Sequence, residues 1–190
     1  MDGQKVEAAE KVYLALNKPR GVVTTASDEQ GRETVYALLE KELPWVAPVG
    51  RLDKASEGLL LLTNDSEWAA RVTSPEIHLD KTYHVQIGVV ADAALIASLA
   101  RGVRSDDGSI LHARSVRILR HGEKNSWLEI VLTEGKNRHI RRMLAGVGVE
   151  VLRLIRVSIG SLVLGELAKG TSRRLTEAEK RALDQAMKRT

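Results

Sequence analysis

The chain of 190 residues contains no cysteine and no phenylalanine. Without cysteine it can form neither disulfide bonds nor thiolate metal sites, and it has no cysteine nucleophile. No apolar run approaches the roughly 20 residues of a membrane-spanning helix, and the polar N-terminus lacks the apolar core of a signal peptide. We therefore expect a soluble cytoplasmic protein that does not associate with a membrane.

Aromatic side chains are scarce, at 3% of the sequence. Proteins that bind single-stranded nucleic acid through a broad stacking platform carry several aromatic rings on one sheet. With so few aromatic rings, we do not expect such a platform in this chain. The aromatic residues are Tyr13, Tyr36, Tyr83, Trp45, Trp68 and Trp127.

Motifs for common cofactors are also missing. The sequence has no GxxxxGK[ST] phosphate loop and no glycine-rich dinucleotide motif after a strand. Its histidines show no spacing typical of metal ligands. We expect neither a metal nor another cofactor. The histidines are His78, His84, His112, His121 and His139.

Positive charge is concentrated in one segment. Lysine and arginine number 29 against 25 acidic residues, an excess of 29 − 25 = 4. Between positions 136 and 156 there are six basic residues and a single acid, Glu150. A concentrated cationic surface attracts phosphate groups, so this segment favours a nucleic-acid partner. For any one basic run, a solvated helix face is the alternative interpretation.

Hydrophobic periodicity predicts alternating strands and helices. We expect strands at 13–17, 22–25, 59–63, 81–90, 115–119, 127–132 and 151–155. We expect helices at 33–43, 67–72, 91–100 and 137–144, and a last helix that begins at a capping box of Thr176 and Glu179. Residues 45–50 should form a proline-containing loop.

These elements predict an α+β fold with a largely antiparallel sheet. The length corresponds to one domain or to two closely packed lobes. Residues 1–10 read as a flexible leader, and 11–190 as the folded domain.

A carboxylate stands in the segment GRLDKASEG, which leads into the apolar run LLLL. This places Asp53 on a glycine-bounded loop next to a buried strand, an arrangement that suits catalysis. Alternatively, Asp53 caps a turn and pairs with Arg51 or Lys54. Glu57 could form a glycosidase-like pair with Asp53, although four residues on a loop fix no separation between them.

Two further segments carry polar residues at regular positions. In KTYHV, Tyr83 shares a strand face with Val85 and Ile87, so it could be a core residue. In EGKNRHIRRML, a helix would bring Arg138 next to Arg141 and Arg142. Ile140, Met143 and Leu144 would be buried on the opposite side.

GRLDKASEGLLLLTND, KTYHV and EGKNRHIRRML, in this order, resemble the bacterial RNA pseudouridine synthases of the ribosomal small- and large-subunit type. LNKPRG and LIRVSIGSLVLGELAKGTSRRLT extend the similarity over residues 11–180. The resemblance implies the pseudouridine synthase catalytic fold, with a mainly antiparallel sheet in two packed lobes and flanking helices. It also implies isomerisation of a specific uridine to pseudouridine in RNA, without a cofactor.

The resemblance also assigns roles to residues. Asp53 takes the position of the catalytic carboxylate, Tyr83 that of the tyrosine that packs against the target base, and Arg141 that of the basic residue paired with the aspartate. Ile140 and Leu154 match apolar positions of the pocket. Nearby basic residues are expected to bind RNA: Arg51, Lys54, Lys136, Arg138 and Arg142.

The sequence departs from the family at two points. His139 stands where many relatives have glutamine or glutamate, and the first ten residues cannot encode the RNA-binding module with which many relatives begin. We expect a monomer that acts on 23S ribosomal RNA, either naked or in an assembling subunit. Two alternatives remain: a non-catalytic RNA-binding protein, and a hydrolase that uses Asp53 and Glu57.

Overall fold

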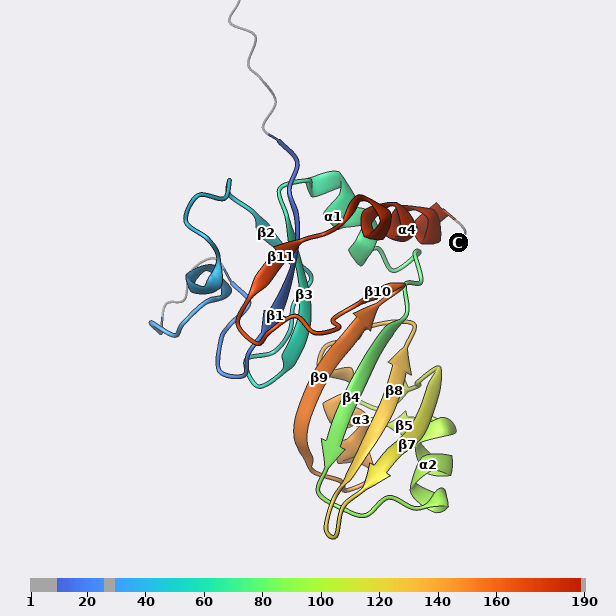
Figure 1. Cartoon of the computed structure of the whole chain (residues 1–190). Coiled ribbons are helices and arrows are strands. Elements are labelled where there is room, and N and C mark those ends of the chain that lie inside the picture. The colour runs from blue at the N-terminus through green and yellow to red at the C-terminus, as the bar shows by residue number, and fades with distance from the viewer. Residues whose placement is uncertain (1–9, 26–29, 189–190) are drawn as a thin grey trace, which may run out of the picture.

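Figure 1 shows a computed structural model, which describes residues 10–25 and 30–188. The strands are β1 (Tyr13–Lys18), β2 (Ala47–Val49), β3 (Glu57–Thr63), β4 (Lys81–Ile87), β5 (Val103–Arg104), β6 (Ile110–Leu111), β7 (Ser115–His121), β8 (Ser126–Leu132), β9 (Val151–Ile159), β10 (Leu162–Val163) and β11 (Ser172–Arg174). The helices are α1 (Ser66–Thr73), α2 (Ala93–Ala100), α3 (His139–Gly146) and α4 (Glu177–Lys188), with a 3₁₀ turn, η1 (Val35–Leu38). Apart from Glu10, the predicted leader lies outside the described residues.

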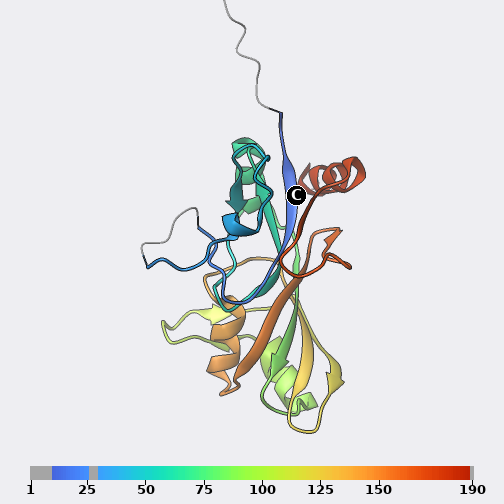
Figure 2. The same ribbon diagram turned by 60° about the vertical axis from the view of Figure 1, so that its left-hand side comes forward.

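The main sheet has the strand order β11-β1-β3-β9-β4-β8-β7, with β2 beside β3 and β10 beside β9. Its pairs are antiparallel except for β3 with β9. We call β11, β1, β3 and β2 with α1 and α4 the first lobe, and β9, β4, β8 and β7 with α2 and α3 the second lobe. Figure 2 shows the helices of the two lobes at opposite ends of the molecule. The predicted α+β fold with a mainly antiparallel sheet is confirmed.

Strand β3 forms the centre of the first lobe. All seven of its residues are buried, as the apolar run predicts. Leu59 and Leu61 face α1 and α4, whereas Leu60 and Leu62 pack against residues of the segment between β1 and β2. The first lobe therefore has a core on each side of its sheet.

The second lobe buries one face of its sheet. Along β4, Tyr83, Val85 and Ile87 are buried and the residues between them are partly exposed, which confirms the predicted alternation. Helices α2 and α3 cover this face (Figure 1) and contribute to one apolar cluster. The members from α3 are Ile140, Met143 and Leu144, as the helical pattern predicted.

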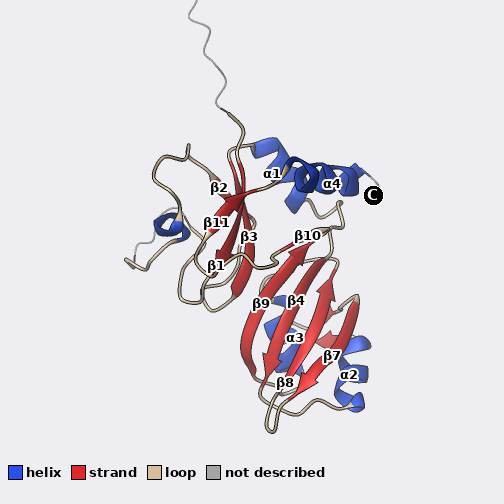
Figure 3. Cartoon of the chain, in the orientation of Figure 1, coloured by secondary structure: helices blue, strands red, loops and turns tan. Residues whose placement is uncertain are grey.

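The segment between β1 and β2 differs from the prediction (Figure 3). The expected strand at 22–25 is a single bridge between Val23 and Thr34, and the expected helix at 33–43 is reduced to η1. The apolar residues of this segment are instead buried through turns against β1 and β3. Tertiary burial here outweighs helical propensity, because the same apolar spacing can be satisfied without a continuous helix.

Two other boundaries differ. Residues Ala47–Val49 form strand β2 rather than a loop. Pro48 is compatible with this strand, because β2 pairs on one side only, with β3. Helix α3 begins at His139, and Arg138 before it has a left-handed backbone. The predicted capping box at α4 is confirmed by bonds between Thr176 and Glu179 in both directions. No helix among the described residues is long and apolar enough to cross a membrane.

The two lobes meet where β3 and β9 run parallel, with Glu57 opposite Ile155 and Gly58 opposite Arg156. A Cβ atom on Gly58 would lie 2.2 Å from the carbonyl oxygen of Arg156 and 2.8 Å from its nitrogen. Gly58 also has a φ of +106°, which L side chains rarely adopt. Only glycine allows the strands to approach so closely.

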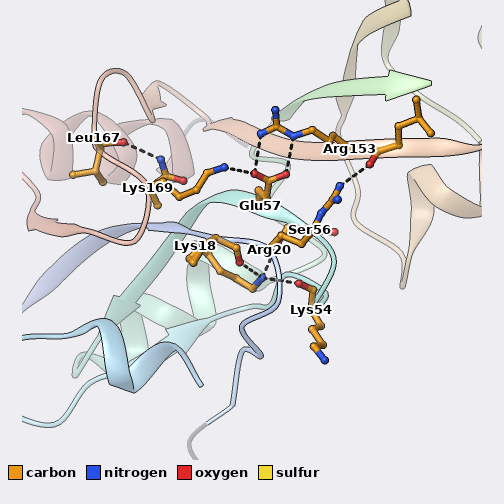
Figure 4. Close-up of polar contacts among 11 residues, drawn as sticks. Lys18, Arg20, Lys54, Ser56, Glu57, Arg153, Leu167 and Lys169 are labelled. Carbon is orange, nitrogen blue, oxygen red and sulfur yellow. Dashed lines mark hydrogen bonds and ion pairs between the residues drawn. The ribbon is translucent and has the colours of Figure 1, made fainter. Parts of the chain in front are cut away.

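A buried carboxylate lies next to this junction (Figure 4). Glu57 on β3 accepts hydrogen bonds from Arg153 Nε at 3.1 Å, Arg153 Nη2 at 2.9 Å and Lys169 Nζ at 2.8 Å. Arg153 belongs to β9, and Lys169 to the segment between β10 and β11. The Glu57 side chain is only 3% exposed. Burial raises the pKa of Glu57, but its two cationic partners outweigh burial and bring it to about 2.

Replacing Gly58 with alanine should destabilise the junction of the lobes. We expect a loss of about 3 kcal/mol in the free energy of unfolding, because a positive φ and a backbone clash act together. Chemical denaturation measures this loss. Gly165→Ala is a matched control: Gly165 has a φ of +58° but nothing within 4 Å of a Cβ, so about 1 kcal/mol is expected. Equal losses for the two variants would contradict the proposed close contact.

Replacing Glu57 with glutamine should change how stability depends on pH. The carboxyl pKa is about 2 in the folded chain, below the ordinary value of 4.5. Its contribution is therefore complete above pH 4.5 and is lost as the pH falls toward 2. Glu57→Gln should be about 2 kcal/mol less stable than wild type at neutral pH, and the difference should shrink through this window. Urea unfolding at several pH values measures it.

Glu10→Gln is the control for this experiment, because Glu10 pairs with Arg174 at the surface and its side chain is 74% exposed. Such pairs contribute at most about 1 kcal/mol. A Glu57→Gln difference that stays constant from neutral to acid pH would show that the charge of Glu57 does not stabilise the junction.

Candidate functional site

A cavity of about 520 Å³ lies where the two lobes meet; we call it the cleft. The first lobe contributes the loop with Asp53, and the second contributes Tyr83, Ile140 and Leu154. Its volume is within the range of small-molecule sites, about 300–1,000 Å³. The cleft therefore contains the predicted carboxylate, aromatic ring and apolar positions together.

The loop with Asp53 is fixed by hydrogen bonds to its backbone. The Ser56 nitrogen donates to the Asp53 carbonyl at 2.9 Å, which closes a turn. Thr24 Oγ1 donates to the Leu52 carbonyl at 2.8 Å, and the Gly21 nitrogen to the Lys54 carbonyl at 2.8 Å. These bonds hold the backbone, while the Asp53 side chain stays 22% exposed to the cleft.

Lys18 supports the same loop from inside the protein (Figure 4). It is fully buried, and its Nζ donates to the carbonyls of Pro19, Lys54 and Ser56 at 3.0, 3.3 and 2.6 Å. Burial lowers the pKa of Lys18 to about 8, although Glu57 and Asp53 oppose this shift. A buried ammonium is costly unless it is hydrogen-bonded, so the three carbonyls and Lys18 stabilise one another.

Two arginines contact the carboxylate of Asp53. Arg138 Nη1 donates to Oδ2 at 3.0 Å, and Arg141 Nε lies 3.9 Å from the same oxygen. The side chain of Arg138 is 51% exposed, whereas that of Arg141 is 16% exposed. Arg141 Nη2 also donates to Ser56 Oγ at 3.3 Å. The expected pairing of Arg141 with Asp53 is present, and Arg138 adds a second partner.

Both arginines have features that are common at ligand-binding sites: a strained backbone in Arg138 and, within the described chain, an unpaired donor in Arg141. Arg138 has a φ of +51°, and no other described residue except glycine has a positive φ. Such strain is concentrated at functional sites. Arg141 Nε is buried and has no hydrogen-bond partner among the described residues. Burial and the charge of Arg138 lower the pKa of Arg141, and Asp53 opposes this.

The second lobe provides an aromatic and apolar wall. Tyr83 is 9% exposed, Ile140 3% and Leu154 6%. Tyr83 and Leu154 come from the neighbouring strands β4 and β9, and Ile140 from the first turn of α3. A flat, apolar surface opposite a carboxylate suits a planar ring that carries a polar edge.

The basic residues expected to bind RNA divide into two groups. Arg51, Lys136 and Arg138 line the cleft, whereas Lys54 is exposed outside it. Arg142 also lies outside the cleft. Its guanidinium binds Ser105 Oγ and Asp107 Oδ2, each at 2.8 Å, so it stabilises the loop between β5 and β6.

Glu57 does not line the cleft. It faces Arg153 and Lys169 instead, so the structure does not bring Asp53 and Glu57 together as a catalytic pair. His139 is 3% exposed, and its Nε2 lies 2.8 Å from the carbonyl oxygen of His112. Burial lowers the pKa of His139. The described residues contain no group of three or more histidine, aspartate or glutamate side chains suited to a metal ion.

Sequence reasoning missed three contributors to the site: Lys18 beneath the loop, and Lys81 and Arg156 in the wall of the cleft. All three stand in segments that carry the family resemblance: LNKPRG, KTYHV and LIRVSIG. Their positions in those motifs are a signal that could have found them. Composition and periodicity could not, because each is a single cation within an apolar strand or beside a turn.

Comparisons with known proteins agree with this geometry. A sequence model described as RNA pseudouridylate synthase matches residues 12–146. The chain is 37% identical over 184 residues to ribosomal large subunit pseudouridine synthase B of Bacillus subtilis (strain 168), which covers 96% of this chain and 75% of that protein. It is 37% identical over 180 residues to an uncharacterized RNA pseudouridine synthase of Aquifex aeolicus, covering 94% and 72%.

A solved structure is also similar. The crystal structure of a pseudouridylate synthase matches with a TM-score of 0.80 and 31% identity, over 93% of this chain and 75% of that chain. The match includes both lobes, since so little of this chain is left uncovered. Together, the family model, the relatives and the fold show that this chain belongs to the RNA pseudouridine synthases, which are isomerases that act on RNA.

Proposed function

We propose that this chain converts a uridine of large-subunit ribosomal RNA to pseudouridine, with Asp53 as the catalytic carboxylate. The observation that carries the proposal is the position of Asp53. It faces the cleft beside two guanidinium groups and opposite Tyr83, Ile140 and Leu154. A carboxylate next to an apolar wall suits a reaction at the bond between a sugar and a planar base.

The reaction breaks the C1′–N1 bond of uridine, turns the base and joins C1′ to C5. No electrons or groups are gained or lost overall, so the residues of the cleft can suffice. The target base must first leave its stack, which costs a few kcal/mol. Phosphate contacts with Arg51, Lys136 and Arg138 at the cleft offset this cost.

Asp53 acts in its ionised form. It serves as a nucleophile toward the sugar or the base, or as a base that removes a proton from the sugar. Arg141 lies 3.9 Å from the carboxylate, and its positive charge offsets part of the cost of placing a negative charge in a partly buried cleft. An arginine suits this role because its planar guanidinium presents several donors in a fixed geometry.

Tyr83 contributes a flat face and a hydroxyl group. The face packs against the uracil ring, together with Ile140 and Leu154. The hydroxyl has no hydrogen-bond partner among the described residues, so it is free to bond to the substrate. We assign the stacking role to the ring and propose that the hydroxyl assists departure of the C5 proton.

The proposed RNA target follows from the relatives. The Bacillus subtilis relative is named for the ribosomal large subunit, and the motifs of this chain also resemble those of ribosomal large-subunit pseudouridine synthase E. We propose 23S ribosomal RNA as the substrate, naked or within an assembling subunit, and a monomeric enzyme. A cytoplasmic location follows from that substrate.

Replacing Asp53 with asparagine should abolish the reaction but leave RNA binding unchanged. Asparagine has nearly the same shape but is neither nucleophile nor base, so we expect a rate loss of at least about 10⁴-fold. Release of tritium from 5-tritiated uridine in ribosomal RNA measures turnover, and filter binding measures affinity. Turnover at the wild-type rate would remove Asp53 from the mechanism, and free uracil among the products would favour a hydrolase.

The two arginines should differ in effect. Arg141→Ala should lower the single-turnover rate about a hundredfold, because it removes a charge from a poorly solvated position. Arg138→Ala should lower it less than about tenfold, because exposed ion pairs contribute at most about 1 kcal/mol. Rates at saturating RNA separate these effects from binding. The reverse order would make Arg138 the main partner of Asp53.

A further inference from the structure

Two cations beside Tyr83 have no role in the scheme above, namely Lys81 and Arg156. Lys81 precedes Tyr83 by two residues on β4, so both side chains leave the same face of the sheet. On β9, Arg156 lies opposite Tyr83 in the antiparallel register. Residues paired in this way have neighbouring side chains. Strand geometry thus places both cations next to the ring of Tyr83, in the wall of the cleft.

Arg156 is buried and only partly hydrogen-bonded. Its side chain is 6% exposed, and Nε donates to the Leu59 carbonyl at 2.8 Å. Nη2 is buried and has no partner among the described residues. An unsatisfied buried donor costs about 1–3 kcal/mol. The described chain therefore supplies no acceptor for Nη2 of Arg156. The cleft that Arg156 lines can admit a ligand that does.

Lys81 is half-buried, and its ammonium group has no hydrogen bond or ion pair within the described ranges. The adjacent Asp80 is paired with Arg114 instead. Burial lowers the pKa of Lys81 and the charge of Arg156 lowers it further, whereas Asp80 opposes both. Lys81 and Arg156 repel each other in a partly buried wall, so a ligand that carries negative charge stabilises both.

The oxygens of RNA that carry negative charge, or gain it in the reaction, are the phosphate oxygens and the carbonyl oxygens of a base. The more exposed cations of the cleft suit phosphates, since Arg138 is 51% and Lys136 42% exposed. Arg156, by contrast, is buried beside Tyr83 and Leu154. An apolar wall suits a base, and the carbonyl oxygens lie at the edge of the uracil ring. The position of the pair therefore favours the base.

We propose that Lys81 and Arg156 bind a carbonyl oxygen of the unstacked uracil and stabilise the negative charge that develops on the ring. This inference rests on the proposed function of the cleft. It adds two catalytic residues that act on the carbonyl oxygens of the base, a role that the scheme above gives to neither Asp53 nor Arg141. Lys81 and Arg156 donate hydrogen bonds and transfer no proton.

The electron balance shows why such donors help. When the C1′–N1 bond breaks, its electron pair stays with the ring and is shared by N1 and the carbonyl oxygens. C1′ gains a pair from the Asp53 carboxylate, or from the C2′–H bond when Asp53 removes that proton. The C1′–C5 bond then forms with an electron pair of the ring, while the bond between Asp53 and C1′ breaks or the proton returns from Asp53 to C2′. The C5 proton leaves and N1 gains a proton, so the product base is neutral and Asp53 is again a free carboxylate. If Asp53 instead adds to the ring, the pair of a ring double bond moves onto a carbonyl oxygen. Each route places charge where Lys81 and Arg156 can stabilise it.

Thio-substituted RNA tests this contact. Replacing either carbonyl oxygen of the target uridine with sulfur weakens hydrogen bonds at that atom. Sulfur also spreads negative charge well, so by itself it makes the ring an easier leaving group. We expect wild-type enzyme to react at least about tenfold more slowly with one of the two thiouridines. Nucleoside chromatography after single turnover measures the rate. Undiminished rates with both thiouridines would overturn the proposal.

Wild-type enzyme and a Lys81 variant can be compared on the same unmodified and thio-substituted RNA. Lys81→Met should lower the single-turnover rate on unmodified RNA about a hundredfold and change the dissociation constant of RNA by less than about twofold. With the thiouridine to which wild type is sensitive, the loss should shrink to below about threefold. Lys81→Arg keeps a cationic donor and should recover most of the rate, which separates loss of charge from faulty folding.

Lys124→Met is the control, because Lys124 is exposed in the turn between β7 and β8; it should react as wild type does. An equal loss with all substrates, or a loss in RNA affinity alone, would overturn the contact with the base. If wild-type enzyme releases no tritium, the proposed function itself fails. If wild-type enzyme releases tritium and the Lys81→Met variant reacts equally fast, only the present inference fails.

Discussion

The short parallel contact between β3 and β9 is the constraint on which the site depends. At that contact Gly58 lies directly against the backbone of Arg156, so the first lobe meets the second without a side chain between them. The loop with Asp53 enters β3, and β9 carries Leu154 and Arg156 and pairs with the strand of Tyr83. A shift of this junction would therefore separate the carboxylate from the aromatic and apolar wall of the cleft.

The buried cations Lys18 and Arg156 are hydrogen-bonded to backbone carbonyls. Lys18 donates to three carbonyls, and Arg156 to that of Leu59. Carbonyl groups carry no net charge, so they do not neutralise these cations. The positive charge of the cations still acts on the cleft and on the loop with Asp53. Between the lobes, Arg20 Nη2 also donates to the Leu152 carbonyl at 2.5 Å (Figure 4). Lys18, Arg138 and Arg141 thus lie around the carboxylate of Asp53, and their positive charge attracts an anionic substrate.

The sequence predicts best where a local pattern has one physical solution. The apolar run of β3, the alternation along β4 and the capping box of α4 were all predictable, since each reflects burial or capping within one element. The segment at 33–43 was not, because its apolar residues are buried through turns. The family motifs predicted Asp53, Tyr83 and Arg141 as neighbours. The second contact of Asp53, with Arg138, depends on a left-handed residue before α3, which no helical pattern indicates.

Asp53 and Glu57 are only four residues apart in the sequence, but their carboxylates lie in different environments. Asp53 lies on the loop and faces the cleft, whereas Glu57 begins β3 and is buried between Arg153 and Lys169. Only one of them can reach a substrate. A glycosidase that inverts its substrate needs a second carboxylate to activate water. An isomerase must avoid this, because water would capture the sugar before the base returns. Placing Glu57 in the junction of the lobes thus stabilises the fold and leaves Asp53 as the single carboxylate of the pair that can face the base.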